Sequence, residues 1–248
     1  MENYRIESTL GEGIFSKVYL VSDLRDGTFH ALKVLKENTD KSSKLFMREI
    51  RALQKIRGIC VPHLLCYESA FVDGGDLNIL TNYVVGYNLK ELNPFIIDKQ
   101  FAENFLSQLL SVLEKLQNER IAHRDIKPTN IIYNPITKTF TIIDFGLSVM
   151  KESKEYAGSK SFFSPTLLRK HDSVKSIRDL LQADIFALGV TLFVVLNGFY
   201  PKEGSWIWNE SSEVVKTVNL MLEDKYTALE VKLQGSLTPE VKLQVHRS

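Results

Sequence analysis

The sequence predicts an α+β fold in two lobes, a small sheet-rich lobe followed by a larger helical one. Strand-like apolar segments separated by glycine turns fill the first third of the chain, whereas apolar residues at helical spacing dominate after Gly86. The composition fits a globular protein, because 44% of the 248 residues are hydrophobic and 25% are charged. We therefore expect residues 1–84 to form the N-terminal lobe, 85–88 a connection and 89–248 the C-terminal lobe.

The N-terminal lobe is expected to be an antiparallel sheet with one helix. Turn signals at Asp26-Gly27 and Asp73-Gly74-Gly75 each join two strand-like segments. Residues Ser42–Arg57 place apolar side chains near helical spacing and charges on the opposite face, which predicts an amphipathic helix. The expected strands are Tyr4–Leu10, Lys17–Ser22, Thr28–Leu35, Leu64–Phe71 and Leu77–Val84.

Helices dominate the expected C-terminal lobe. Apolar periodicity predicts helices over Phe101–Gln117, Ala183–Asn197 and Ser211–Leu222. Short strands are expected at Asn130–Tyr133 and Phe140–Ile143, on either side of an Asn-Pro turn. The longest apolar run lies within the second helix and falls short of the roughly 20 residues that cross a bilayer, so we expect a core helix and no membrane span.

Charge, cysteines and the N-terminus narrow the class of protein. A net charge of +1 indicates no broad attraction to nucleic acid or anionic lipid. Cys60 and Cys66 form neither a disulfide framework nor a four-ligand zinc pattern, so free buried thiols are expected. The first residues lack the pattern of a secretory signal, and an intracellular location, cytoplasmic or nuclear, is therefore expected.

The segment Gly11-Glu12-Gly13-Ile14-Phe15-Ser16-Lys17-Val18 lies between two expected strands. Its glycines would let backbone amides approach a polyphosphate without a Cβ in the way. A strand follows rather than a helix, which disfavours a dinucleotide-binding fold. An ordinary glycine hairpin is the alternative at this point.

Lys33 lies inside an otherwise apolar strand, where an unpaired ammonium would be costly to bury. Glu49, on the following helix, could pair with it and leave the ammonium facing a ligand's phosphates. Two solvated surface charges are the alternative for this pair taken alone.

The segment His123-Arg124-Asp125-Ile126-Lys127-Pro128-Thr129-Asn130 concentrates an acid, two bases and an amide between a helix and a strand. Turn chemistry alone does not account for the whole pattern. Asp144-Phe145-Gly146 follows a buried strand, so its carboxylate emerges at a strand end, where it could bind Mg²⁺.

In order and spacing these motifs resemble the eukaryotic-type protein kinases, from about residue 4 to residue 200. The resemblance implies the bilobal protein-kinase fold, with ATP bound between the lobes. It places the following residues around the nucleotide: Leu10, Gly11, Glu12, Gly13, Val18, Ala31, Lys33, Thr81, Asn82, Val84, Asn88 and Ile132. Two positions depart from the family, Ser16 at the third glycine and Asn82 where an acidic residue is more usual.

The resemblance also implies the catalytic groups. Asp125 would accept or orient the proton of the substrate hydroxyl, and Lys127 would steady the γ-phosphate. Asn130 and Asp144 would hold Mg²⁺, while Lys33, oriented by Glu49, would contact the α- and β-phosphates. A lysine at position 127 resembles serine/threonine kinases, so the expected substrate is a protein Ser or Thr hydroxyl.

Three further residues are expected to regulate the site: Arg124, Glu155 and Ser159. Relatives often carry a phosphorylated residue whose charge pairs with the arginine of His-Arg-Asp. We hypothesise that Glu155 supplies that charge permanently to Arg124, against the alternative of a merely exposed glutamate. Asp184 matches the family's aspartate that anchors the catalytic loop, here residues 123–130, against the alternative of a charge at a helix N-terminus.

The end of the chain departs from the family pattern. Ser164-Pro165-Thr166 replaces Ala-Pro-Glu, and no late arginine pattern is evident, so we expect a C-terminal lobe shortened at its end. Trp206-Ile207-Trp208 could contact a protein partner there. The alternatives to a protein kinase are a pseudokinase that acts as a nucleotide-binding scaffold and a kinase of small molecules.

Overall fold

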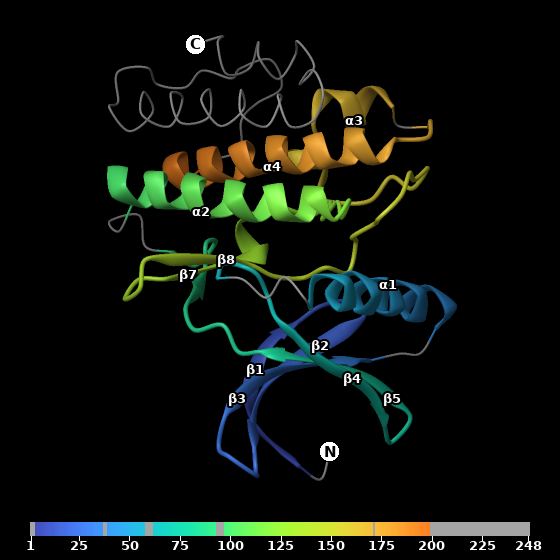
Figure 1. Cartoon of the computed structure of the whole chain (residues 1–248), viewed down its shortest axis with the longest axis vertical. Coiled ribbons are helices and arrows are strands. Elements are labelled where there is room, and N and C mark those ends of the chain that lie inside the picture. The colour runs from blue at the N-terminus through green and yellow to red at the C-terminus, as the bar shows by residue number, and fades with distance from the viewer. Residues whose placement is uncertain (1–2, 37–38, 58–61, 93–96, 171, 199–248) are drawn as a thin grey trace.

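The computed structural model describes residues 3–36, 39–57, 62–92, 97–170 and 172–198, which form two lobes (Figure 1). The N-terminal lobe is an antiparallel sheet in the order β1-β2-β3-β5-β4, with α1 beside it. The expected α+β fold is thereby confirmed. The elements of this lobe are β1 (Tyr4–Glu12), β2 (Ser16–Asp23), β3 (Phe29–Leu35), α1 (Asp40–Ile56), β4 (Tyr67–Asp73) and β5 (Asp76–Asn82).

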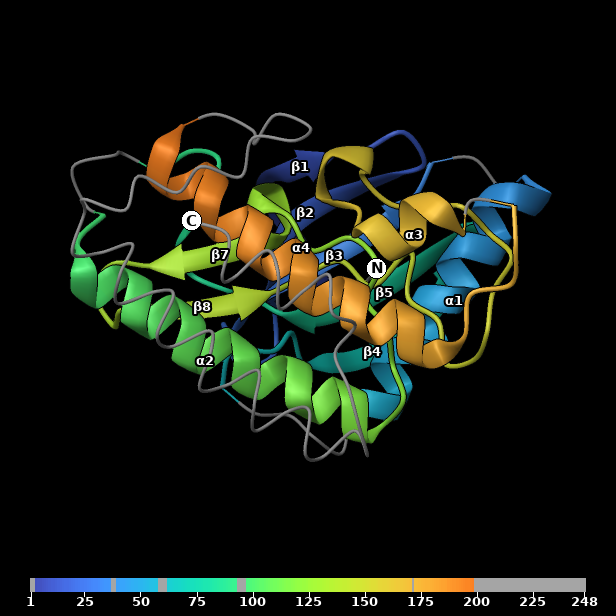
Figure 2. The same cartoon turned by 90° about the horizontal axis from the view of Figure 1, so that it is seen from above.

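The C-terminal lobe is mainly helical. Helices α2 and α4 lie side by side, and a small sheet in the order β6-β7-β8 lies between them and the first lobe (Figures 1 and 2). Its elements are β6 (Tyr87–Asn88), α2 (Lys99–Asn118), η3 (Pro128–Asn130), β7 (Ile131–Asn134), β8 (Thr139–Ile142), η4 (Lys160–Phe162), α3 (Pro165–Arg169) and α4 (Ile177–Asn197), with η denoting a 3-10 helix.

Aromatic packing fixes β7 and β8 against α2. The ring of Phe140 lies 4.9 Å from Phe101, 5.3 Å from Phe105 and 4.6 Å from Tyr133, measured between ring centroids. All four rings are buried. Such contacts add to the free energy gained by burying the rings. These two strands, which lie in the chain between the expected catalytic segment and Asp144-Phe145-Gly146, are therefore held in place by packing on α2.

The strand boundaries differ from the sequence prediction where the two lobes meet. The fourth strand begins at Tyr67 rather than Leu64, because Leu64 forms an isolated parallel bridge with Ile142 of β8. The fifth strand ends at Asn82 rather than Val84. The chain then passes Gly86, which has a positive φ of +145°. A Cβ at this position would lie 2.3 Å from the carbonyl oxygen of Tyr133, so there is room only for glycine. The lobe division itself, with a connection at residues 85–88, stays a prediction.

Helix α4 begins at Ile177, six residues before the predicted start. Ser176 and Asp179 form a capping box that starts the helix, and Gly198 ends it with a left-handed φ of +72°. By length and composition α4 could cross a membrane, but 72% of its most apolar window is buried inside the fold, as in a core helix.

Cys66 is disulfide-bonded, so the expectation of a free thiol is wrong for this residue. Sequence spacing alone does not give the distance between two sulfur atoms, on which a disulfide depends.

Three expectations lie outside the described residues. They are the helix over Ser211–Leu222, the shortened end of the C-terminal lobe and the partner contact at Trp206-Ile207-Trp208.

Candidate active site

A cavity of about 550 Å³ lies between the two lobes. Every residue that the sequence places around a nucleotide lines it, from Leu10 at the end of β1 to Ile132 in β7. Sequence reasoning missed further lining residues, among them Leu65, Ile79 and Ile143. Ile143 directly precedes Asp144 in the chain, so its place beside the motif was readable from the sequence. Ile79 is brought in by the pairing of β5 with its neighbours, and Leu65 by a hydrogen bond from its backbone N–H to the carbonyl oxygen of Ile142.

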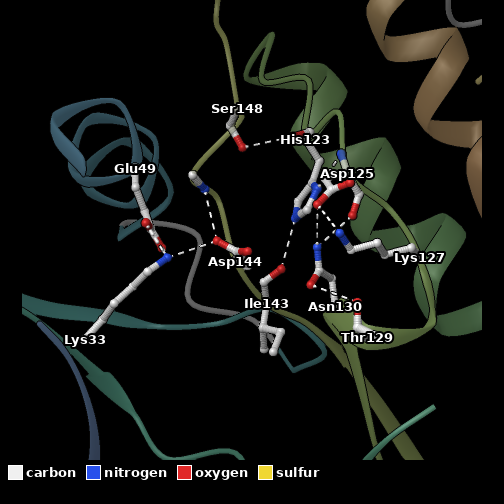
Figure 3. Close-up of polar contacts among 11 residues, drawn as sticks. Lys33, Glu49, His123, Asp125, Lys127, Thr129, Asn130, Ile143, Asp144 and Ser148 are labelled. Atoms are coloured by element: carbon white, nitrogen blue, oxygen red, sulfur yellow. Dashed lines mark hydrogen bonds and ion pairs between the residues drawn. The ribbon is translucent and has the colours of Figure 1, made fainter. Parts of the chain in front are cut away.

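Lys33 binds two carboxylates that arrive from different elements (Figure 3). Its Nζ lies 2.9 and 2.6 Å from the two carboxylate oxygens of Glu49 on α1, and 3.0 Å from Oδ1 of Asp144 after β8. Glu49 is buried, while the Asp144 side chain is 43% exposed and lines the cavity. The structure thus brings the two predicted partners together and adds a third.

The charges of Lys33 and Asp144 are stabilised in this triad, whereas burial raises the pKa of the Glu49 carboxyl in spite of the nearby Lys33 ammonium. The positive charge of Lys33 lowers the pKa of Asp144 to about 2. Burial opposes a charge on Lys33, but Glu49 and Asp144 outweigh it and raise the pKa of the ammonium above its ordinary value. The site therefore holds a fixed cation and a fixed, partly exposed carboxylate at neutral pH.

Asp125 is the centre of a second polar cluster, which lies on the other side of Asp144 from Lys33 (Figure 3). Its Oδ2 lies 2.7 Å from Nζ of Lys127 and accepts a 3.1 Å hydrogen bond from Nδ2 of Asn130. Its Oδ1 accepts a 2.9 Å hydrogen bond from the hydroxyl of Ser159, and Lys127 donates to that hydroxyl oxygen at 3.1 Å. A hydroxyl, a carboxylate and an ammonium are therefore held in mutual contact.

A glycine lets Ser159 reach this position. Gly158 has a φ of +119°, and a Cβ there would lie 2.4 Å from the carbonyl oxygen of Arg124. The segment can pass this close to the catalytic loop only without a side chain.

Asp184 anchors the backbone of the catalytic loop from within α4. Its two carboxylate oxygens accept hydrogen bonds from the backbone N–H groups of His123, at 2.6 Å, and Arg124, at 2.7 Å. Burial raises the pKa of Asp184 to about 7, although the two donors favour the charged form. Because α4 begins at Ile177, the alternative of a charge at the helix N-terminus is wrong.

His123 connects this loop to the Asp-Phe-Gly segment. Burial lowers the pKa of the imidazole, so the ring is neutral; its Nε2 lies 3.1 Å from the carbonyl oxygen of Ile143, and Nδ1 lies 3.3 Å from the backbone N of Asp125. This pattern fits a ring protonated at Nε2. The ring also contacts Phe145, with the centroids 4.8 Å apart.

Glu155 bridges two arginines. Its Oε2 lies 2.7 Å from a guanidinium nitrogen of Arg48 on α1 and 3.1 Å from one of Arg124. Arg124 also donates to the backbone carbonyl of Glu155 at 2.8 Å. Burial alone would raise the pKa of Glu155, but the two guanidinium groups outweigh it and lower the pKa. The partner on α1 was not visible in the sequence.

The oxygen atoms near Asp144 fit a hard divalent cation. Among the described residues, Oδ1 of Asp144 accepts from Lys33 and from the backbone of Gly146, whereas Oδ2 has no hydrogen-bond partner. Asn130, which also lines the cavity, donates its amide N–H groups toward Asp125 and leaves Oδ1 with only a 3.5 Å contact from Thr129. The described residues hold no cluster of three or more His, Cys, Asp or Glu side chains suited to a metal, so phosphate and water oxygens would have to complete the shell.

Comparison with known proteins identifies the family to which the chain is similar. Residues 4–243 match the family described as the protein kinase domain. The chain is 32% identical over 86% of its length to the candidate sperm motility kinase W of Mus musculus, covering 42% of that protein. It is 29% identical over 96% of its length to serine/threonine-protein kinase cds1 of Schizosaccharomyces pombe, covering 52%. For CBL-interacting protein kinase 26 of Oryza sativa the identity is 27%, over 81% of this chain and 41% of that protein. The chain thus spans about half the length of these curated relatives.

Proposed function

Because this chain belongs to the eukaryotic-type protein kinase family, we propose that it transfers the γ-phosphoryl group of ATP to a serine or threonine hydroxyl of a protein, with Mg²⁺ as cofactor. Members of the family act on protein substrates and generally use ATP and Mg²⁺. The main structural support for this proposal is the triad of Lys33, Glu49 and Asp144, which lies at a cavity of about 550 Å³. Its charges suit a polyphosphate and a cation.

Each catalytic group has a task in this proposal. Lys33 binds the α- and β-phosphates, and Glu49 holds the ammonium in place. Asn130 and Asp144 hold Mg²⁺, which when bound neutralises charge on the phosphates. Asp125 orients the substrate hydroxyl and takes its proton as the new O–P bond forms; the bond to the bridging oxygen breaks and ADP leaves. Lys127, in contact with Asp125, steadies the transferred group.

The proposed regulation rests on Glu155. Its contacts with Arg124 and Arg48 join residues 144–165, which match the activation segment of the family, to the catalytic loop and to α1, the helix that carries Glu49. We propose that this permanent charge holds the site in its active arrangement without a phosphate. Ser159, which contacts both Asp125 and Lys127, positions these two side chains.

A phosphotransfer assay tests the function. Wild type, Asp125→Asn and Asp144→Asn are incubated with radiolabelled ATP, Mg²⁺ and a mixture of proteins. We expect phosphoserine or phosphothreonine from the wild type, and at least a hundredfold less from either variant, because each loses a charged group used in the transition state. Nucleotide binding without transfer by the wild type would instead support the pseudokinase scaffold, to which Ser16 and Thr166 point. Transfer to a small alcohol would support the small-molecule kinase.

A further inference from the structure

A second groove, of about 630 Å³, lies outside the site described above. One wall is the stripe of α1 that contains Lys44, Met47, Arg48 and Arg51, and the other is the segment 148–153 that follows the Asp-Phe-Gly motif. Residues three and four apart share one face of a helix, so these four side chains point the same way. Figures 1 and 2 both show the segment running alongside α1.

The groove is strongly basic. Four cations line it, Lys44, Arg48 and Arg51 from α1 and Lys151 from the segment, against the single carboxylate of Glu152. Arg48 is engaged by Glu155. In the part of the chain that the structure describes, the side chains of Lys44, Arg51 and Lys151 form no hydrogen bond or ion pair. In a chain with a net charge of only +1, three cations without partners in one groove are a local concentration of positive charge.

The rest of α1 does not offset this charge. The helix contains five basic residues and two acidic ones, Asp40 and Glu49, and Glu49 is buried against Lys33. Asp40 lies in the first turn, where a carboxylate favours the helix N-terminus. Neither of these carboxylates lines the groove, so α1 supplies only positive charge to it.

The groove also offers apolar contacts. Met47 is 40% exposed, and Val149 and Met150 line the opposite wall. Methionine side chains adapt to partners of different shape. An occupant that carries both carboxylates and an apolar side chain would match these surfaces.

We propose that this groove binds an acidic segment of a partner protein, with carboxylates paired to Lys44, Arg51 and Lys151 and an apolar side chain against Met47. Clusters of basic residues recognise acidic motifs in this way. The lining contains no aromatic side chain on which a base could stack, which favours a peptide over a single-stranded nucleic acid. Since α1 also carries Glu49, an occupant touching both walls would hold this helix against the activation segment.

Fluorescence anisotropy with the whole chain tests the proposal. The probe is a fluorescein-labelled peptide, Glu-Leu-Glu-Glu-Leu-Glu-Glu-Leu-Glu, and the reference is the same peptide with Gln in place of every Glu. We expect the acidic peptide to bind at least tenfold more tightly. Lys44→Glu combined with Arg51→Glu should weaken its binding at least tenfold, which is about 1.4 kcal/mol. Met47→Ser should weaken it severalfold through the lost apolar contact.

The control reverses the same number of charges on the other lobe, by Lys99→Glu combined with Lys115→Glu on α2, and should leave binding unchanged. Equal affinity of the wild type and the Lys44→Glu, Arg51→Glu variant would overturn the proposal. So would a 20-nucleotide single-stranded DNA that competes as well as the peptide, which would assign the groove to nucleic acid. Hydrogen exchange provides a second readout, because bound peptide should protect residues 44–51 and 148–153 in the wild type alone. Neither measurement depends on phosphotransfer, so this proposal and the proposed function can fail separately.

Discussion

The Asp144 carboxylate lies 3.0 Å from the ammonium of Lys33, which is the main cause of its low pKa. Lys33 lowers the pKa of this carboxylate to about 2, whereas in the unfolded chain it has its ordinary value near 3.8. A carboxylate with a lowered pKa in the folded state stabilises the fold above its unfolded pKa, and this contribution is lost as the pH falls through the folded value. For Asp144 the loss falls between about pH 4 and pH 2.

This gives a pH-dependent prediction for one side chain. Asp144→Asn should lower the free energy of unfolding at pH 6, and the gap to the wild type should shrink as the pH falls from about 4 toward 2. Urea unfolding at a series of pH values measures it. In a Lys33→Met background the shrinking gap should be absent or reversed, since the cation that lowers the pKa is gone. A gap that is constant with pH in the wild-type background would contradict the assignment.

At the scale of elements, single side chains join α1, α4 and the loops around the cavity. Asp184 connects α4 to the catalytic loop, and Glu155 connects the activation segment to Arg124 and to Arg48 on α1. The Arg124 side chain is only 3% exposed, so loss of Glu155 would leave a buried guanidinium with fewer partners. The charge of Glu155 therefore links the positions of α1, the catalytic loop and the activation segment.

The Glu155 bridge gives a prediction about activity. Glu155→Ala and Glu155→Gln should each reduce phosphotransfer by about tenfold, or about 1.4 kcal/mol, because both remove the charge that holds α1 and the loop together. Glu152→Gln, three residues earlier in the same segment, is the matched control and should retain activity. Initial rates at saturating ATP measure the effect, and treatment of the wild type with phosphatase should change nothing. Equal rates for Glu155→Ala and the wild type would contradict the proposal that the charge of Glu155 maintains the active arrangement.

The whole molecule encloses the nucleotide cavity with side chains from both lobes. Val18, Ala31 and Lys33 come from the sheet, and Asn130 and Ile132 come from the other lobe. A ligand that contacts both lobes binds the folded chain and not the unfolded one, so it must stabilise the whole fold.

Thermal unfolding should report this. At a concentration about 100 times its Kd, MgADP should add about 2.7 kcal/mol to the free energy of unfolding. In a chain of this size that corresponds to a rise in Tm of roughly 5–10 °C. Lys33→Met should reduce the rise by removing a phosphate contact, whereas Lys99→Met, on the surface of α2, should not. No rise in the wild type at any MgADP concentration would contradict nucleotide binding.

Much of this arrangement was readable from the chain. Turn signals and apolar periodicity predicted α1, α2 and seven strands within three residues, because hydrogen bonding and side-chain direction repeat locally in strands and helices. The start of α4 was predicted six residues too late, and β6 and α3 were not predicted. Lys33, Asp125 and Asp144 were recognisable because the motifs that contain them resemble, in order and spacing, those of the protein kinases. Where pairing is non-local the prediction was wrong, as for Leu64, which bridges to β8 instead of starting a strand.

The partners of the charged groups came from packing instead. Arg48 meets Glu155 across 107 residues, and Asp184 meets the backbone of His123 across 61. No local pattern encodes such pairs, since the helices and loops must first pack before these atoms meet. The same holds for the basic groove, whose two walls are separate segments that lie side by side in the folded chain. The sequence motifs thus identify the residues that we propose as catalytic, whereas long-range packing determines which charged side chains face one another.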